Sequence, residues 1–154
     1  MRVVHIITGL GDGGAEHALF KICKYDIKNE HFVISLKGPG KYFRLLNKAG
    51  TKAYCLNLRF YSIQKIFLLI KLIRSLKPDI VQTWLVHADF IGGIAARLAG
   101  VKNILWNIRY SNIEFGKAKF TTIFIIRILS ILSYILPKYI LSVSRKANKI
   151  YINK

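Results

Sequence analysis

Short apolar runs alternate with helix-like stretches along the whole chain, and this alternation limits the fold more than any other feature. The runs are rich in Val, Ile, Leu and aromatic residues, which is typical of strands buried on both faces of a parallel sheet. Six strands are expected, at residues 3–7, 31–36, 52–56, 80–83, 103–107 and 139–143. Helical spacing predicts helices from about residue 15 and over residues 42–49, 62–76, 87–99 and 120–136, with Ser144 capping a last short one.

Strict alternation of this kind predicts a Rossmann-like α/β fold. We expect three layers, with a mostly parallel sheet of about six strands and helices on both of its faces. The chain has 154 residues and is 53% hydrophobic, which suits one domain over residues 1–154 with a sizeable core. Disorder is not expected, because disordered chains are poor in Ile, Leu and Phe.

The net charge is strongly positive. Twenty-five Lys and Arg residues oppose seven Asp and Glu residues, for a formal charge of +18. This balance favours polyanions such as nucleic acid, anionic lipid or phosphorylated ligands. The cations are scattered along helices, however, and neither an RNA-recognition sheet nor a helix-turn-helix is indicated, so nucleic acid is not an expected partner.

Cys23 and Cys55 are the only cysteines, and both fall on apolar faces of expected elements. We interpret them as buried thiols, since no spacing typical of a metal or redox site is present. No metal and no cofactor are therefore expected. The first strand begins within two residues of the N-terminus, which favours a cytoplasmic protein without a cleaved signal peptide.

The most apolar helix, over residues 120–136, carries Arg127 at its middle. It is short for a bilayer and a central Arg is costly in lipid, so a buried or interfacial helix is expected instead of a membrane span. His17, Lys21, Lys24 and Lys28 form a basic stripe on the first helix, which offers a second contact for anionic headgroups.

Ligands of open α/β sheets bind beyond the carboxyl ends of the strands, so the segments there are the candidate site. The first is a glycine-rich turn from residue 9 to Glu16, in which Gly13 and Gly14 open a helix. Free amides and the helix dipole suit a phosphate or a sugar at this place. The pattern is neither GxGxxG nor a Walker loop, and an ordinary strand–helix turn remains the alternative.

The fourth strand is followed by Trp84, His87 and Asp89 at the start of a helix. His87 can hydrogen-bond a sugar hydroxyl or move a proton, although a structural histidine is the alternative. Asp89 orients His87 or caps the helix; acidic residues are favoured in a first turn in any case.

The fifth strand leads to Asn107 and Arg109, and the sixth to Ser144. The planar guanidinium of Arg109 suits a phosphate, and Asn107 offers polar contacts. Ser144 is a helix cap first and a ligand contact second.

Taken in order, the segments IITGLGDGGAEHALFKI, SLKGPGKYFRLLNKAG, KPDIVQTWLVHADFIGGIAARLAGV, NIRYSN and ILSVSRKAN resemble glycosyltransferase family 4. More narrowly, they are similar to bacterial enzymes of capsule and lipopolysaccharide synthesis. The resemblance implies a GT-B fold of two Rossmann-like domains. It also implies retaining transfer of a sugar from a nucleotide donor to a glycan or lipid-linked acceptor, usually without metal.

The resemblance gives the candidate residues their roles. His87 would be the catalytic residue, next to the donor sugar at the reacting centre. Gly13 and Gly14 would approach the donor, whereas Asp89 and Arg109 would shape the acceptor side of the cleft. Glu16, Trp84, Asn107 and Ser144 complete the expected substrate-binding set.

The donor-binding C-terminal domain of the family, with its Glu-x7-Glu motif, has no counterpart in the 154 residues. We therefore expect an acceptor-side N-terminal half that is inactive alone, whether as a truncated product, a fragment or one part of a split enzyme with a separate partner polypeptide. The alternative is a non-catalytic module that binds a nucleotide or a membrane surface. Peripheral attachment to the inner face of the cell membrane is a further expectation.

Overall fold

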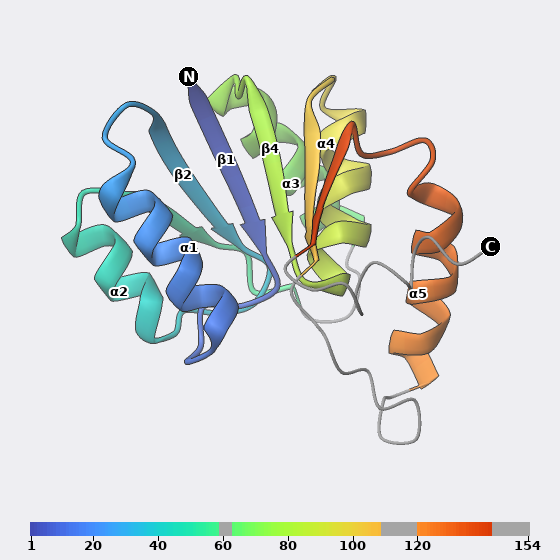
Figure 1. Ribbon diagram of the computed structural model, residues 1–154, viewed down its shortest axis with the longest axis horizontal. Coiled ribbons are helices and arrows are strands. Elements are labelled where there is room, and N and C mark those ends of the chain that lie inside the picture. The colour runs from blue at the N-terminus through green and yellow to red at the C-terminus, as the bar shows by residue number, and fades with distance from the viewer. Residues whose placement is uncertain (59–62, 109–119, 143–154) are drawn as a thin grey trace.

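Six parallel strands form the centre of the structure, a computed structural model that describes residues 1–58, 63–108 and 120–142 (Figure 1). The strand order is β3-β2-β1-β4-β5-β6, and every pair of neighbours in this described sheet is parallel. The strands are β1 (Arg2–Ile7), β2 (Glu30–Ser35), β3 (Lys52–Cys55), β4 (Ile80–Trp84), β5 (Ile104–Ile108) and β6 (Tyr139–Ser142). The predicted Rossmann-like α/β fold is confirmed.

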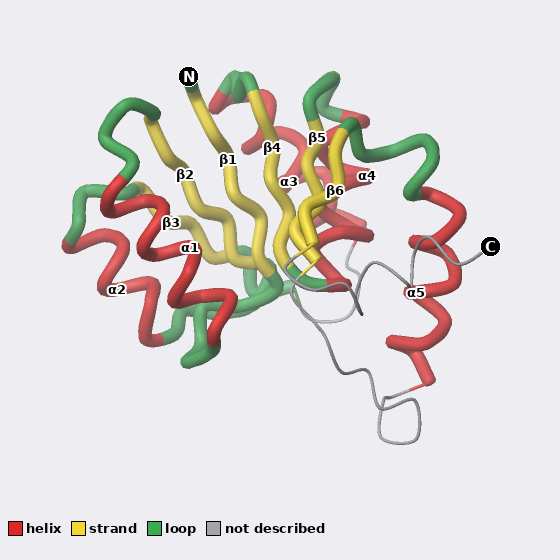
Figure 2. Tube along the Cα trace, viewed as in Figure 1, coloured by secondary structure: helices red, strands yellow, loops and turns green. Residues whose placement is uncertain are grey.

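Helices cover both faces of the sheet (Figure 2). They are α1 (Gly14–Tyr25), α2 (Lys41–Lys48), α3 (Ile63–Leu76), the π-helix η1 (Ala88–Gly92), α4 (Gly93–Leu98) and α5 (Phe120–Leu132). On one face, Ile7 and Val33 pack with Leu19 of α1 and Leu46 of α2. The other face carries the larger core, in which Val4 and Ile6 pack in one cluster with residues of α3, α4 and α5.

The alternation of β1 explains how it serves both cores. Val4 and Ile6 point to one face and His5 and Ile7 to the other, because successive side chains of a strand alternate. All four are buried, so β1 is covered on both faces. The run of apolar residues that predicted a buried strand therefore reflects two layers of helices.

The helix expected over residues 87–99 differs from the prediction. A π-helical turn interrupts it: Val86 and His87 are α-helical, η1 follows from Ala88, and the helix is α-helical again from Gly93. Gly92 and Gly93 lie against the sheet: a Cβ at Gly92 would come within 2.8 Å of Ile6 Cγ2, and one at Gly93 within 3.1 Å of Trp106 Nε1. Close approach to the sheet is thus the reason for this glycine pair, as its cost in helix propensity suggested.

Three other expectations concern the end of α5, the ends of β4 and β5, and the helix after Ser144. α5 ends at Leu132, four residues before its expected end. Strands β4 and β5 each run one residue further than expected. The short helix after Ser144 lies outside the described residues.

We expect Gly92→Ala to lower the free energy of unfolding by about 1–3 kcal/mol, the usual cost of overpacking a core. The backbone of Gly92 is helical, so Ala adds no backbone strain there, and the clash of the new methyl group with Ile6 must outweigh a gain of up to about 1 kcal/mol in helix propensity. Urea denaturation measures it. Gly14→Ala is the matched control, because a Cβ there meets nothing within 4 Å. A Gly92→Ala protein as stable as the parent would contradict the close packing.

Candidate functional site

Parallel strands bring the turns after β1, β2 and β4 to one edge of the sheet, at the end where the strand arrows point (Figure 1). The turns after β1 and β2 are joined by their backbones: Lys37 N donates to Thr8 O at 3.0 Å, and Tyr42 N donates to Leu10 O at 3.1 Å. Gly40 lies so close that a Cβ would collide with the carbonyl of Leu10. This contact demands glycine, and it fixes the glycine-rich turn against the start of α2.

The N-terminus of α1 is formed by Gly13 and Gly14, as the sequence predicted. Gly13 is the N-cap in extended conformation and its position has no side-chain cap. The carboxylate of Glu16 turns back toward it, since a Cβ at Gly13 would be 2.5 Å from Glu16 Oε2. A carboxylate is favourable at this positive end of the helix. Glu16 therefore competes with any phosphate for the same place, whereas the space beside Gly14 is open.

His87 follows an irregular stretch of backbone. Leu85, directly after β4, has a φ of 73°, in the left-handed region that a bulky side chain rarely adopts. The π-helix η1 starts immediately after His87. Strained residues and π-turns are often found at functional sites, where they aim a side chain that regular structure would turn elsewhere.

Lys37 joins His87 at this edge from the end of β2. Its aliphatic part runs beside Gly9, where a Cβ would be 3.5 Å from Lys37 Cδ. Burial, and secondly the charge of Lys37, lower the pKa of the half-buried His87 below its ordinary value. His87 is thus a neutral imidazole at physiological pH, able to accept or donate a hydrogen bond, next to a cation suited to an anionic ligand.

Asp89 lies beneath this edge, in η1, and is fully buried. Thr83 Oγ1 donates to Asp89 Oδ1 at 2.6 Å, and Oδ2 has no hydrogen-bond partner among the described residues. Burial raises the pKa of Asp89 to about 8, against the lowering effect of the Thr83 bond. The carboxyl group ties η1 to β4 and is not exposed to a ligand in this structure.

Trp84 and Asn107 are likewise buried, at the ends of β4 and β5. The indole of Trp84 contacts the core beneath α1, and its Nε1 donates to His5 Nδ1 at 3.3 Å. Neither side chain is exposed at this edge, because both are covered by the packing around the sheet. We leave both out of the proposed ligand contacts.

Arg109 and Ser144 lie outside the described residues. The structure therefore places Gly13, Gly14, Glu16 and His87 of the predicted set at one edge of the sheet, and it adds Lys37 beside His87. Lys37 was missed because it lies in an ordinary basic sequence; its place just before Gly38 and Pro39, where β2 ends, was the only signal.

The sequence matches no model of a protein family. No curated protein gives a significant match either. Solved structures do match. The Anabaena protein Alr3699/HepE, in complex with UDP, superposes with a TM-score of 0.81 at 15% identity, over 99% of this chain and 40% of its own.

The chain has the fold of one half of a GT-B protein. The lipopolysaccharide outer core galactosyltransferase WaaB, in its apo form, matches with a TM-score of 0.66 at 15% identity, over 99% of this chain and 42% of its own. A UDP-N-acetylglucosamine 2-epimerase matches with a TM-score of 0.61 at 13% identity, over 99% of this chain and 44% of its own. This chain spans less than half the length of these GT-B neighbours, and membership of family 4 stays a prediction.

The buried carboxyl group of Asp89 makes the free energy of unfolding depend on pH in a direction that can be predicted. Between about pH 4 and pH 8 the folded state holds the Asp89 proton and the unfolded state does not, so Asp89 makes stability fall as pH rises. Asp89→Asn should remove this fall while keeping a polar partner for Thr83. Urea denaturation across this range, compared between the two proteins, measures it.

The effect of Asp89 is the difference between the stability curves of the parent and Asp89→Asn, because His5 changes the free energy of unfolding with pH in the opposite direction. Its pKa is lowered to about 3, chiefly by burial, so it makes stability rise from about pH 3 to its ordinary value near 6.5. Both proteins share that contribution. Parallel curves for the parent and Asp89→Asn would show that Asp89 is ionised in the folded state.

Proposed function

We propose that this chain is the N-terminal, acceptor-side half of a retaining glycosyltransferase. It would transfer a sugar from a nucleotide-sugar donor to a lipid-linked or polysaccharide acceptor of the cell surface. One observation carries the proposal: the parallel sheet brings the open turn at Gly14, the cation of Lys37 and the neutral imidazole of His87 to a single edge. Each group suits one part of such a reaction.

His87 is the residue proposed to act on the reacting sugar. A neutral imidazole can hydrogen-bond a sugar hydroxyl without the repulsion that a second cation beside Lys37 would create. The strained Leu85 and the π-helix η1 hold it at the edge. Lys37, Gly13 and Gly14 would receive anionic or hydroxyl groups of the ligand, with Glu16 displaced or turned to bond a sugar hydroxyl.

A second Rossmann-like domain is required by the same proposal. The GT-B neighbours are more than twice as long as the part that this chain matches, and the Anabaena protein was solved with UDP. A donor held between two domains loses much of its binding and positioning when one domain is missing. Catalysis therefore depends on a second domain, whether on the same or a separate polypeptide.

Sugar transfer should appear only when the chain is combined with a GT-B C-terminal domain, and His87→Ala should then lower kcat about 10- to 100-fold. That range corresponds to loss of one strong hydrogen bond in the transition state. His17→Ala is the matched control, since its exposed ring bonds Tyr42. The assay measures transfer from a UDP-sugar with and without the second domain.

Two results would contradict this proposal. Full transfer by the 154 residues alone would show that no second domain is needed. Micromolar binding of UDP by the chain alone, with no transfer under any combination, would favour a non-catalytic nucleotide-binding module. The epimerase among the neighbours shows that a GT-B fold also serves other chemistry.

Membrane contact is the second part of the proposal. No helix among the described residues combines the length and the apolar character that crossing a bilayer requires. His17, Lys21 and Lys24 of the basic stripe are exposed on α1, whereas Lys28 lies beyond the helix, which ends at Tyr25. Because α1 and α5 pack on opposite faces of the sheet, the stripe and α5 do not form one surface. The α5 side has exposed apolar residues next to Arg127 and Lys138: Phe124, Ile131, Tyr134 and Ile135.

We therefore expect the α5 side to bind vesicles that contain anionic lipid. Ile131→Glu should weaken this binding about tenfold, since burying one large apolar side chain contributes roughly 1.5–3 kcal/mol. Co-sedimentation measures the bound fraction. Ile27→Glu, at an exposed isoleucine just after α1, is the control. A larger loss with Ile27→Glu would assign the contact to the α1 side instead.

A further inference from the structure

Three side chains able to bind a metal converge between α1 and the sheet, away from the edge that carries His87 and Lys37. His5 comes from β1, Cys23 from the last turns of α1 and His31 from the start of β2. One donor atom of each lies within 4.8 Å of the other two. His5 and His31 are buried and Cys23 is partly buried. Their positions in the sequence follow no metal-binding spacing, and only the packing of α1 on the sheet brings them together.

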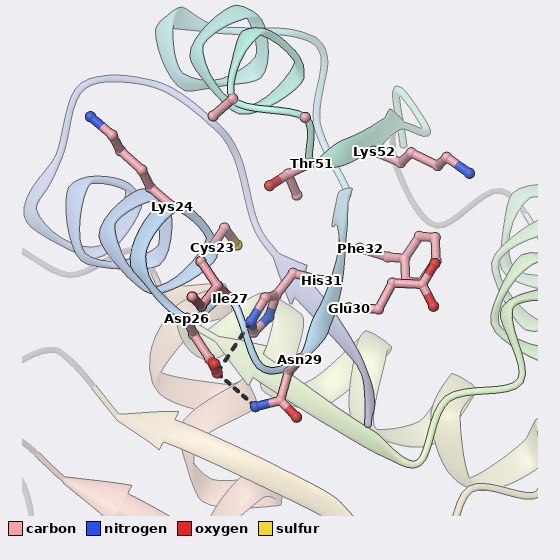
Figure 3. Close-up of a pocket in the computed structure, with 12 residues that line it drawn as sticks. Cys23, Lys24, Asp26, Ile27, Asn29, Glu30, His31, Phe32, Thr51 and Lys52 are labelled. Atoms are coloured by element: carbon pink, nitrogen blue, oxygen red, sulfur yellow. Dashed lines mark hydrogen bonds and ion pairs between the residues drawn. The ribbon is translucent and has the colours of Figure 1, made fainter.

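A cavity of about 350 Å³ opens beside the cluster, and Figure 3 shows Cys23 and His31 at its wall. Lys24, Asp26, Asn29 and Thr51 are among the other lining residues, so its wall is partly polar. A cavity of this size holds water easily. A cation bound by the three side chains would therefore have a fourth ligand available from solvent.

Asp26 lies where the carboxylate partner of a metal-bound histidine usually lies, beside the ring nitrogen of His31 that would not bind the ion. His31 Nε2 lies 3.3 Å from Asp26 Oδ2, and this contact is drawn in Figure 3. The opposite ring nitrogen, His31 Nδ1, faces His5 Nε2 at 3.0 Å. Histidines that bind metal generally donate their other N–H to a carboxylate or carbonyl, which fixes the tautomer and aims the lone pair at the ion.

Without a metal, hydrogen bonds account for both ring nitrogens of His5 and for Nδ1 of His31, whereas His31 Nε2 has no hydrogen-bond partner among the described residues. Trp84 Nε1 can only donate, so His5 Nδ1 accepts and His5 Nε2 carries the proton donated to His31 Nδ1. Metal binding would move that proton to Nδ1 and cost the Trp84 bond. Gln82 lies opposite His5 in the pairing of β1 with β4 and raises the pKa of His5, so its side-chain carbonyl is a candidate acceptor for the relocated proton.

We propose that His5 Nε2, Cys23 Sγ and His31 Nδ1 together bind one Zn²⁺ ion, with water as the fourth ligand. Two histidines and one thiolate suit this borderline-soft cation. Tetrahedral coordination puts nitrogen ligands about 3.3 Å apart and nitrogen and sulfur about 3.6 Å apart. The two nitrogens must separate by a few tenths of an ångström from 3.0 Å, and the sulfur, which lies within 4.8 Å of both, must approach them by up to about 1.2 Å.

The binding step is balanced by one proton. Cys23 is a thiol in the metal-free protein, because burial raises its pKa to about 12. Zn²⁺ replaces the thiol proton, which leaves to solvent, and a zinc–thiolate bond forms. The ion would pin the end of α1 to β1 and β2. It lies on the covered α1 side of the sheet, so its role is to stabilise the fold and not to act on the sugar.

Zinc titration of the purified chain should show one equivalent bound and a rise in Tm, since a ligand of the folded state stabilises it. Co²⁺ in place of Zn²⁺ should give a thiolate-to-cobalt charge-transfer band. Cys23→Ser should abolish the band and weaken Zn²⁺ binding at least tenfold. Asp26→Asn should weaken binding about 10- to 100-fold with the band retained, as expected of a residue that orients a ligand.

Two controls separate this site from adventitious binding. Cys55→Ser removes the other cysteine, on β3, and His17→Gln removes an exposed histidine of α1; neither should change the band or the affinity. The absence of a charge-transfer band, or equal Zn²⁺ affinity of Cys23→Ser and the parent, would overturn the proposal. Should Cys23→Ser fail to fold by circular dichroism, Asp26→Asn decides the matter by the same affinity measurement.

Discussion

The parallel pairing of β1 with both β2 and β4 is the constraint on which the rest of the structure depends. It forces each connection to cross one face of the sheet, and it brings the turns after all three strands to one edge. The chain leaves β1 toward β2 on one side and later returns to β4 on the other. Ligand sites of open α/β sheets lie at such a reversal of strand order. The candidate site is therefore a result of topology before it is a result of any side chain.

Close packing then fixes the positions of the elements at this edge. Gly40 lets the start of α2 touch the backbone of the glycine-rich turn, and Gly92 lets η1 rest on Ile6. Leu85 and the π-helix have unfavourable backbone geometry, which the buried core around them holds in place. Asp89 is a second unfavourable feature, because its carboxyl group is buried with a single hydrogen bond, from Thr83, and burial raises its pKa. The irregular parts of the fold thus gather where His87 and Lys37 meet.

The cores on the two faces of the sheet differ in composition. The larger core, with α3, α4 and α5, supplies most of the buried apolar area and supports η1 from below. On the α1 side, polar residues interrupt the core: Trp84, His5 and His31 form a hydrogen-bond chain, and His31 Nε2 lies 3.3 Å from Asp26 Oδ2 without a hydrogen bond among the described residues. A buried polar chain costs stability unless each member is satisfied. The neighbouring sulfur of Cys23 offers a third ligand to a metal ion that would replace the hydrogen bond between His5 and His31.

By itself, the sequence determined the fold class, the order of the described elements, most of their bounds to within about a residue, and the edge of the sheet at which Gly13, Gly14 and His87 lie. Those features depend on periodicity and on breakers such as glycine and proline, which act locally. Only the tertiary structure decided that Lys37 joins His87, that Trp84, Asn107 and Asp89 are buried, and that His5, Cys23 and His31 converge. Each of these depends on how the helices rest on the sheet. Distances between residues far apart in the chain are set by packing, and no local pattern encodes them.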